Sequence, residues 1–327
     1  MNSHVVIPVL IAFVISLVLG PVVIPFLRRL KMGQTERVEG VQSHLKKAGT
    51  PTMGGIIILA AVVITSLFYV KDYPKIIPVL FLTVGFGLIG FLDDYLKVVM
   101  KRSDGLFPMQ KMALQIVVTA IFAFYIVKVA KIPLTMIVPF SGGYELNLGW
   151  LAIPVLFFAV IGTVNGTNFT DGLDGLASSV TVLVATFFTV VAIGTKSGIE
   201  PITCAVVGAL MGFLLFNVYP ASVFMGDTGS LALGGFVAGT AYMMQMPLYI
   251  IIVGFIYLVE VISVILQVTY FKKTGGTIPN IRPGQDTANY LTKEIRKTIT
   301  IGAVALSLIA LVPCVLSGLF NISKLSF

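Results

Sequence analysis

The sequence predicts an all-α, polytopic integral membrane protein with about ten transmembrane helices. Of its 327 residues, 57% are hydrophobic and only 11% are charged, whereas about 25% of the residues in an ordinary soluble domain carry a charge. The mean hydropathy is +1.00. Because no polar linker is long enough to separate two soluble domains, the composition favours one domain built into a lipid bilayer.

Apolar runs recur along the chain, and charged residues interrupt them. A transmembrane helix needs about 20 mostly apolar residues. The runs cover residues 5–27, 54–69, 76–92, 112–129, 151–164, 177–193, 202–216, 231–244, 248–268 and 300–319. Several are short and rich in glycine. Gly235 and Gly239 have the spacing that is typical of closely packed membrane helices.

The distribution of basic residues predicts the orientation. With the N-terminus outside, most of the 22 Lys and Arg residues fall into loops on the opposite side, within residues 28–47, 97–111 and 272–297. Positive residues gather on the cytosolic side of membrane proteins. We therefore expect both termini outside and any active site at the cytosolic face. The net charge of +8 does not indicate a nucleic-acid partner, because no soluble surface is predicted on which a basic stripe could lie.

Carboxylates gather in three of the predicted cytosolic segments. Asp93 and Asp94 follow the third run, Asp171 and Asp174 lie in a glycine-rich segment, and Asp227 precedes the eighth run. Carboxylate oxygens suit magnesium or calcium. A zinc site is not indicated, since the chain contains only two histidines. We expect the five carboxylates to converge on one site at the membrane surface.

Three of these carboxylates have a structural alternative. We expect Asp171, Asp174 and Asp227 to stand just before helices that run outward. An acidic residue there caps exposed N–H groups and complements the helix dipole, usually by about 0.3–1 kcal/mol. For each of them, helix capping and ligand binding remain open alternatives.

The neighbouring pair Asp93 and Asp94 does not have that alternative. The run that ends at residue 92 is predicted to run inward, so the pair lies at a helix C-terminus, where the dipole disfavours negative charge. Adjacent carboxylates also repel each other. The pair therefore requires a cation or a proton, and Lys97 and Lys111 can supply part of the compensation. A solvated pair at the surface remains an open alternative.

The predicted surface site combines groups that suit phosphates. Helix N-termini with glycine-lined N–H groups accept phosphate, carboxylates hold a divalent ion, and the bilayer accommodates a lipid tail. This combination indicates phosphoryl transfer at the membrane interface. No P-loop pattern occurs in the sequence, so an ATP-driven motor is not indicated.

The motifs resemble the phospho-N-acetylmuramoyl-pentapeptide transferase family, within the polyprenyl-phosphate hexose-1-phosphate transferase superfamily. The resemblance covers residues 1–276, and its motifs lie in family order at residues 47–55, 93–94, 165–176, 217–221 and 225–230. It implies transfer of phospho-MurNAc-pentapeptide from UDP-MurNAc-pentapeptide to undecaprenyl phosphate, giving lipid I and UMP. It also implies Mg²⁺ as cofactor, a homodimer and a multi-pass protein of the bacterial inner membrane.

The same resemblance implies roles for individual residues. Asp93, Asp94 and Asp227 correspond to catalytic positions, with Asp227 as the magnesium ligand. The nucleoside pocket corresponds to Lys47, Asn168, Asp171, Gly172, Asp174 and Phe224. The phosphates correspond to Lys97, Lys111 and Asn217. A phosphate monoester with a second pKa near 6 is mostly dianionic at neutral pH, so we expect Asp93 to contribute little as a base.

The resemblance ends after residue 276. The family continues with a loop that contains three histidines, and this chain has none there. Residues 277–327 resemble instead a C-terminal segment of the channel subunit of the Sec translocon, through the sequence 278–284. We therefore expect a transferase-like membrane domain of nine helices over 1–276 and an atypical loop plus a tenth helix over 277–327, with turnover impaired by the replaced loop.

Two rival functions remain open at this point. One is a related UDP-sugar:polyprenyl-phosphate sugar-1-phosphate transferase that uses the same carboxylates. The other is a channel or transporter subunit, motivated by the translocon-like segment and by Glu260 in the middle of an apolar run. An ionisable residue inside a membrane segment is a candidate functional residue, although a helix–helix hydrogen bond explains it equally well.

Overall fold

The computed structural model describes residues 3–30, 50–100 and 105–274. The chain divides into two units, Met1–Val264 and Ile265–Phe327. Of the second unit, the structure describes only residues 265–274, which continue the last helix. Lys47 and the predicted span 300–319 lie outside the described residues.

The described residues are mostly helical, as the sequence predicts. The helices are α1 (Ser3–Arg29), α3 (Gly55–Leu67), α4 (Ile76–Val98), α5 (Pro108–Phe124), α6 (Ala152–Thr170), α7 (Leu176–Thr195), α8 (Glu200–Asn217), α9 (Gly226–Met243), α10 (Tyr249–Val253) and α11 (Phe255–Thr274). A π-helical turn, η1 (Tyr125–Val129), extends α5, and a 3₁₀ turn, η2 (Gly149–Leu151), precedes α6. Among the described residues, six helices are long and apolar enough to cross a membrane, and α3 and Phe255–Thr269 are shorter apolar helices.

The predicted span 248–268 is wrong as a single helix. It is divided into α10 and α11 at Gly254, which has φ −97° and ψ 27°. The N–H of Gly254 still donates to the carbonyl of Ile250, at 2.8 Å. A Cβ at this position would lie 2.8 Å from the ring of Tyr257. Glycine therefore fits this break because it has no side chain to displace Tyr257.

Two other helices are longer than predicted at the end that carries the polar motifs. Helix α4 continues beyond residue 92 to Val98, and α6 continues beyond residue 164 to Thr170. In α4, Lys97 pairs with Asp93 one turn earlier and places a positive charge in the last turn, where the helix dipole favours it. Asp93 and Asp94 therefore lie on the helix itself and not after its end.

A small β-hairpin was not expected from the sequence. Strands β1 (Met136–Ile137) and β2 (Glu145–Leu146) pair antiparallel, with Met136 opposite Leu146. Strands of two residues are too short to show an alternating apolar pattern. Gly142 and Gly143 adopt positive φ values in the connecting turn, which glycine does at no steric cost.

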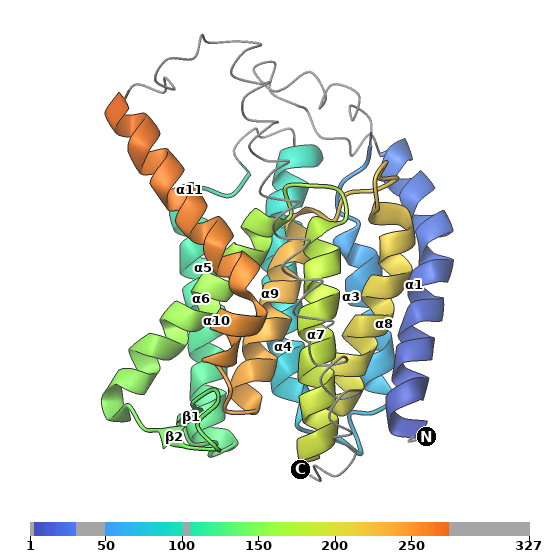
Figure 1. Cartoon of the computed structure of the whole chain (residues 1–327). Helices are drawn as coiled ribbons and strands as arrows, with labels where there is room; N and C mark the ends of the chain where they lie inside the picture. The colour runs from blue at the N-terminus through green and yellow to red at the C-terminus, as the bar shows by residue number, and fades with distance from the viewer. Residues whose placement is uncertain (1–2, 31–49, 101–104, 275–327) are drawn as a thin grey trace, which may run out of the picture. The chain divides into compact units, whose positions relative to one another are not determined.

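The helices α4 and α9 lie side by side in the middle of the bundle of the first unit (Figure 1). Glycines line their contact. A Cβ at Gly235 would lie 2.7 Å from the carbonyl oxygen of Leu82, and a Cβ at Gly90 would overlap the carbonyl of Asp227. Because the backbones approach this closely, residues near the end of α4 reach the first turn of α9.

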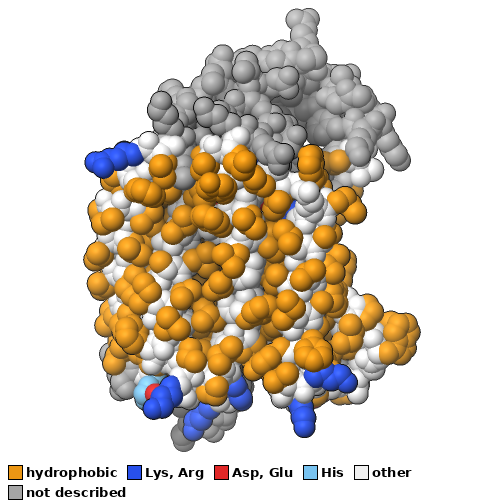
Figure 2. Space-filling view, turned by 180° about the vertical axis from the view of Figure 1, so that it is seen from behind, with side chains coloured by type: hydrophobic (Ala, Val, Ile, Leu, Met, Phe, Trp, Pro, Cys, Tyr) orange, Lys and Arg blue, Asp and Glu red, His pale blue; other side chains and the backbone are white. Residues whose placement is uncertain are grey.

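The lateral surface of the bundle is apolar. Figure 2 shows hydrophobic side chains over most of one face, with Lys and Arg side chains along its lower edge and at its upper left edge. Exposed apolar side chains of α1 include Leu10, Val14, Val18 and Val22. Large contiguous apolar surfaces are rare on soluble monomers, so this surface indicates that the chain spans a membrane.

We predict that Gly90→Ala destabilises the protein. The new methyl group would push α4 away from the Asp227 carbonyl, and overpacking of this kind costs about 1–3 kcal/mol. Apparent melting temperatures in detergent measure the effect. The control is Gly162→Ala in α6, where a Cβ would meet nothing within 4 Å. Equal melting temperatures for the two variants would contradict the close contact of α4 and α9.

Candidate active site

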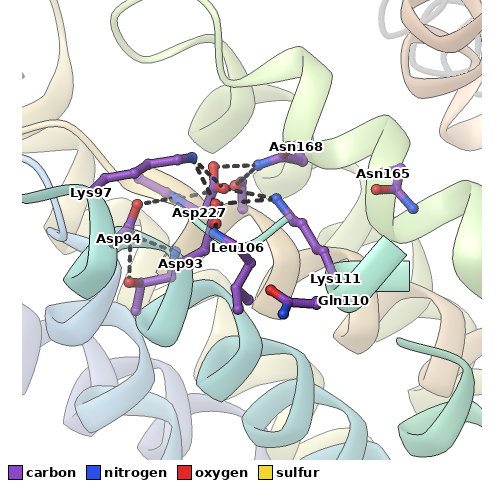
Figure 3. A network of polar contacts seen from close by, with 12 residues as sticks. Asp93, Asp94, Lys97, Leu106, Gln110, Lys111, Asn165, Asn168 and Asp227 are labelled. Atoms are coloured by element: carbon purple, nitrogen blue, oxygen red, sulfur yellow. Dashed lines mark hydrogen bonds and ion pairs between the residues drawn. The ribbon is translucent and has the colours of Figure 1, made fainter. Parts of the chain in front are cut away.

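The ends of three helices bring opposite charges together (Figure 3). Asp93 and Lys97 come from the last turns of α4, Lys111 from the first turn of α5 and Asp227 from the first turn of α9. The Asp93 side chain is only 3% exposed, whereas that of Lys97 is 40% exposed. The cluster is therefore partly buried but open to solvent on the side of Lys97.

Two lysines bridge two carboxylates in this cluster. The Nζ of Lys97 lies 2.7 Å from Asp93 Oδ2 and 3.2 Å from Asp227 Oδ2. The Nζ of Lys111 lies 2.8 Å from Asp227 Oδ2 and 3.5 Å from Asp93 Oδ2. Two positive charges thus balance two negative charges, and the lysines hold the two carboxylates in one group.

Hydrogen bonds fix the other oxygens of the same carboxylates. The backbone N–H of Leu106 donates to Asp93 Oδ1 at 2.7 Å. The Nδ2 of Asn168 donates to Asp227 Oδ1 and to Ser230 Oγ, each at 2.8 Å. Both carboxylates therefore have a defined orientation, and their Oδ2 atoms face the lysines.

Asp94 has a different set of contacts from its neighbour Asp93. Its Oδ1 accepts the backbone N–H of Asp227 at 3.2 Å, and its Oδ2 accepts both the N–H of Thr228 at 2.9 Å and the Oγ1 hydroxyl of Thr228 at 2.6 Å. These N–H groups are among the first of α9, which have no partner within the helix. Asp94 therefore caps α9 from a neighbouring helix, an arrangement that the sequence did not predict.

The segment before α3 holds the start of α9 from the other side. The N–H groups of Gly54 and Gly55 donate to the carbonyls of Phe224 and Met225, both at 2.8 Å. A Cβ at Gly55 would overlap the backbone of Gly229. Gly54 and Gly55, at the end of the motif 47–55, therefore allow a close backbone contact that fixes the segment leading to Asp227.

Asp171 and Asp174 lie in the turn between α6 and α7. Asp171 is the C-cap of α6, so the expectation that it directly precedes a helix is wrong. Burial raises the pKa of Asp171, and the negative charges of Asp227 and Asp94 raise it further, while a hydrogen bond from the Gly226 backbone lowers it. Asp174 Oδ2 accepts the N–H of Ala221 at 3.1 Å.

Other predicted site residues are placed less centrally. Asn217 is buried, accepts the Ser178 hydroxyl at 2.9 Å and donates to the carbonyl of Val223 at 3.0 Å. It therefore does not join the lysine–carboxylate cluster. Gly172 is exposed, and Phe224 is partly buried next to the segment that contacts Gly54.

Several residues of the site were not singled out from the sequence. Leu106 acts through its backbone, so its side chain carries no signal. Gln115, one turn after Lys111, forms a reciprocal amide pair with Asn165, with N–O distances of 2.9 and 3.4 Å. This pair joins α5 to α6, the helices that carry Lys111 and Asn168.

The donor set of the cluster fits a magnesium ion that is held together with a phosphate. Asp93 Oδ2 and Asp227 Oδ2 contact the same two ammonium groups, so two hard anionic oxygens are brought together at this position. No group of three or more His, Cys, Asp or Glu suited to a metal occurs among the described residues. Magnesium usually takes one or two carboxylates, with waters and substrate phosphates as the remaining ligands.

Comparisons with known proteins place the chain in a family. A model of glycosyl transferase family 4 matches residues 76–245, and signature 1 of phospho-N-acetylmuramoyl-pentapeptide-transferase matches residues 47–59. The phospho-N-acetylmuramoyl-pentapeptide-transferase of Acetivibrio thermocellus is 49% identical over 278 residues, which cover 84% of this chain and 83% of the relative. The chain belongs to the phospho-N-acetylmuramoyl-pentapeptide-transferase family.

Further relatives of the family agree. The phospho-N-acetylmuramoyl-pentapeptide-transferase of Clostridium novyi is 50% identical over 278 residues, which cover 84% of this chain and 85% of that relative. The protein of the same name from Caldicellulosiruptor bescii is 45% identical over 276 residues, which cover 84% of this chain and 85% of that relative. The family signature at residues 47–59 includes the glycines that contact the start of α9, so one motif of the family has a defined structural role here.

We predict that Asp171→Asn stabilises the protein at neutral and alkaline pH. Because the folded-state pKa of Asp171 is raised above an unfolded value of about 3.9, folding becomes less favourable as pH rises from about 4 toward the folded pKa. The variant lacks this penalty. Its gain in melting temperature should therefore be smallest near pH 4 and larger at pH 8, measured in detergent with EDTA.

Asp174→Asn serves as the matched control for that measurement. It removes one negative charge from the same turn, while the amide oxygen can still accept the N–H of Ala221. A gain of equal size and pH dependence in both variants would contradict a specific effect of Asp171.

Proposed function

We propose that this chain transfers phospho-MurNAc-pentapeptide from UDP-MurNAc-pentapeptide to undecaprenyl phosphate, giving lipid I and UMP. The observation that supports it most directly is the shared contact of Asp93 and Asp227 with Lys97 and Lys111. The family relatives carry the name of this transferase. The enzyme class follows from the family, and the substrates are part of the proposal.

The proposed reaction forms one P–O bond and breaks another. An oxygen of undecaprenyl phosphate attacks the sugar-linked phosphorus of the UDP donor, and the bond to UMP breaks. Lys97 and Lys111 bind and neutralise phosphate oxygens, which is the main requirement of phosphoryl transfer. Asp93, oriented by the N–H of Leu106, faces the lipid phosphate, which is mostly dianionic at neutral pH and so needs little help from a base.

Magnesium is part of the proposal, with Asp227 as its ligand. When bound, the ion would neutralise charge on the phosphates of the donor. Asp227 is suited to this role because Asn168 fixes its Oδ1 while its Oδ2 faces Lys97 and Lys111. The lysine ammonium groups contact the same oxygen, so they would shift toward the phosphates when the ion binds.

The nucleoside pocket is proposed from the family motif. Its residues are Lys47, Asn168, Asp171, Gly172, Asp174 and Phe224. Support comes from Asn168, which contacts Asp227, and from the open position of Gly172. For Asn217, the contacts with Ser178 and Val223 favour a role in holding the segment before Phe224, with only an indirect effect on phosphate binding.

We propose the same topology that charge counting predicts. The chain would have about ten spans, both termini outside and its active site at the cytosolic face of a bacterial inner membrane, where it would act as a homodimer. Of the basic segments that motivate this orientation, residues 97–111 include the end of α4 that carries the cluster. Positive residues near span ends set orientation.

We also propose that residues 277–327 form a translocon-like segment after a transferase-like part, 1–276. The relatives from Acetivibrio thermocellus and Clostridium novyi align over 278 residues, a length close to that of the proposed transferase part. The chain contains only His4 and His44, so it cannot supply a histidine-rich loop. Turnover should therefore rise when the family's histidine-containing loop is restored to this chain.

Asp94 is proposed as a positioning residue. Its three hydrogen bonds with Asp227 and Thr228 occupy both of its oxygens, whereas Asp93 faces the lysines. Asp94 would thus fix the position of the Asp227 backbone in the site without contacting the phosphates itself.

We predict that the purified full chain in lipid vesicles forms UMP and lipid I from the two proposed substrates, and that Asp227→Asn abolishes the Mg²⁺-dependent part of the rate. The measurement is conversion of radiolabelled donor against Mg²⁺ concentration. Conversion of UDP-GlcNAc in place of the MurNAc-pentapeptide donor would favour a related sugar-phosphate transferase. Turnover that does not rise when the family's histidine-containing loop is restored would contradict the proposed effect of the missing histidines.

We predict that Thr228→Val lowers kcat roughly tenfold to hundredfold, because it removes a hydrogen bond to a charged group worth about 1.5–3 kcal/mol. The KM for the UDP donor should change little. Asp94→Asn should show the same kcat and KM pattern with a larger loss. If Asp94→Asn abolishes activity while Thr228→Val behaves as the native protein, a direct chemical role for Asp94 would replace the positioning role.

A further inference from the structure

The hairpin of β1 and β2 carries exposed aromatic side chains at the end of the bundle opposite the charged cluster. Phe140 in its turn is 93% exposed, Tyr144 is 63% exposed, and Trp150 on the segment between β2 and α6 is 80% exposed. We call these three residues the aromatic tip. Exposing large aromatic side chains to water is unfavourable, because their apolar surface stays hydrated.

The length of the flanking helices fixes the depth of the aromatic tip. Helix α6 begins just after Trp150 and ends at Thr170. Its last turn carries Asn168, which contacts Asp227 of the cluster. Its 19 residues span about 28 Å at a rise of about 1.5 Å per residue. A bilayer has a hydrocarbon core about 30 Å thick. If the cluster lies at one membrane surface, the aromatic tip therefore lies at the other.

The hairpin is held rigidly to the bundle. The N–H of Ile137 donates to the carbonyl of Gln245 at 2.8 Å, and Gln245 Nε2 donates to Thr135 Oγ1 at 2.6 Å. The Thr135 hydroxyl donates to Glu145 Oε2 at 2.8 Å, and Met136 is buried. A two-stranded hairpin is only marginally stable alone, so these contacts hold the aromatic tip outward.

Charged groups around the hairpin indicate the polar boundary of the membrane. Lys128, Lys131 and Glu145 are exposed on the same connection between α5 and α6. Directly beyond Trp150, the lipid-facing surface begins with Leu151 and Ile153, both exposed. Aromatic rings with a polar atom favour this boundary between headgroups and acyl chains.

We infer that the aromatic tip inserts into the headgroup–acyl boundary of the leaflet opposite the charged cluster and anchors the connection between α5 and α6 there. The occupant of this surface is lipid, because the exposed rings continue the apolar, lipid-facing surface of α6 and adjoin charges at headgroup level. The inference does not depend on the proposed reaction.

The chain contains one tryptophan, so the fluorescence of Trp150 tests this directly. The full chain is reconstituted in phosphatidylcholine–phosphatidylglycerol vesicles whose acyl chains carry bromine either near the headgroup or near the bilayer centre. The expected result is quenching roughly twofold stronger from the shallow bromine than from the deep one. Iodide, present on both faces of the vesicles, should quench weakly.

A variant with Trp150→Phe and Ile116→Trp is the control. Ile116 lies within α5 and is 43% exposed, so its replacement should be quenched more by the deep bromine. Strong quenching of Trp150 by iodide with none by either lipid would overturn the inference and leave the aromatic tip in water. Protection from iodide without quenching by either lipid would place protein over the tip, a second copy or another partner, and would also overturn it.

Discussion

The close backbone contact between α4 and α9 is the constraint on which the rest of the structure depends. Gly90 lies against the carbonyl of Asp227, and Gly235 against that of Leu82. In a membrane, helices pack tightly where small residues let backbones approach. Here that packing also determines chemistry, since it brings the carboxylates of one helix end to the first turn of another. A single methyl group at this contact would separate them.

Hydrogen bonds and ion pairs between charged groups then organise the residues at this contact. Asp94 satisfies the first N–H groups of α9, and Lys97 and Lys111 balance Asp93 and Asp227. Because the Asp93 side chain is only 3% exposed, removing both lysines would leave its negative charge with little compensation. The positive charges of the cluster come from Lys97 and Lys111, which we propose to bind the phosphates of the substrates.

Much of this arrangement could be predicted from the sequence, for reasons that differ between elements. The helices follow from apolar runs, and the glycine-rich and acidic motifs pointed to the residues that meet. The extension of α4 past Asp94 could not be predicted, because the capping of α9 by Asp94 is a contact between segments far apart in the chain. The division of α10 from α11 and the hairpin also depend on tertiary contacts, those of Gly254 and of Gln245.

The most direct test of this account is an experimental structure of the full chain in a lipid nanodisc, determined with Mg²⁺ and UMP. The account predicts that the carboxylates of Asp93 and Asp227 lie close enough to contact the same magnesium ion or the same lysine ammonium group, beside Lys97 and Lys111. It would be contradicted by carboxylates separated by more than about 10 Å, the distance over which exposed charges are screened at ordinary ionic strength.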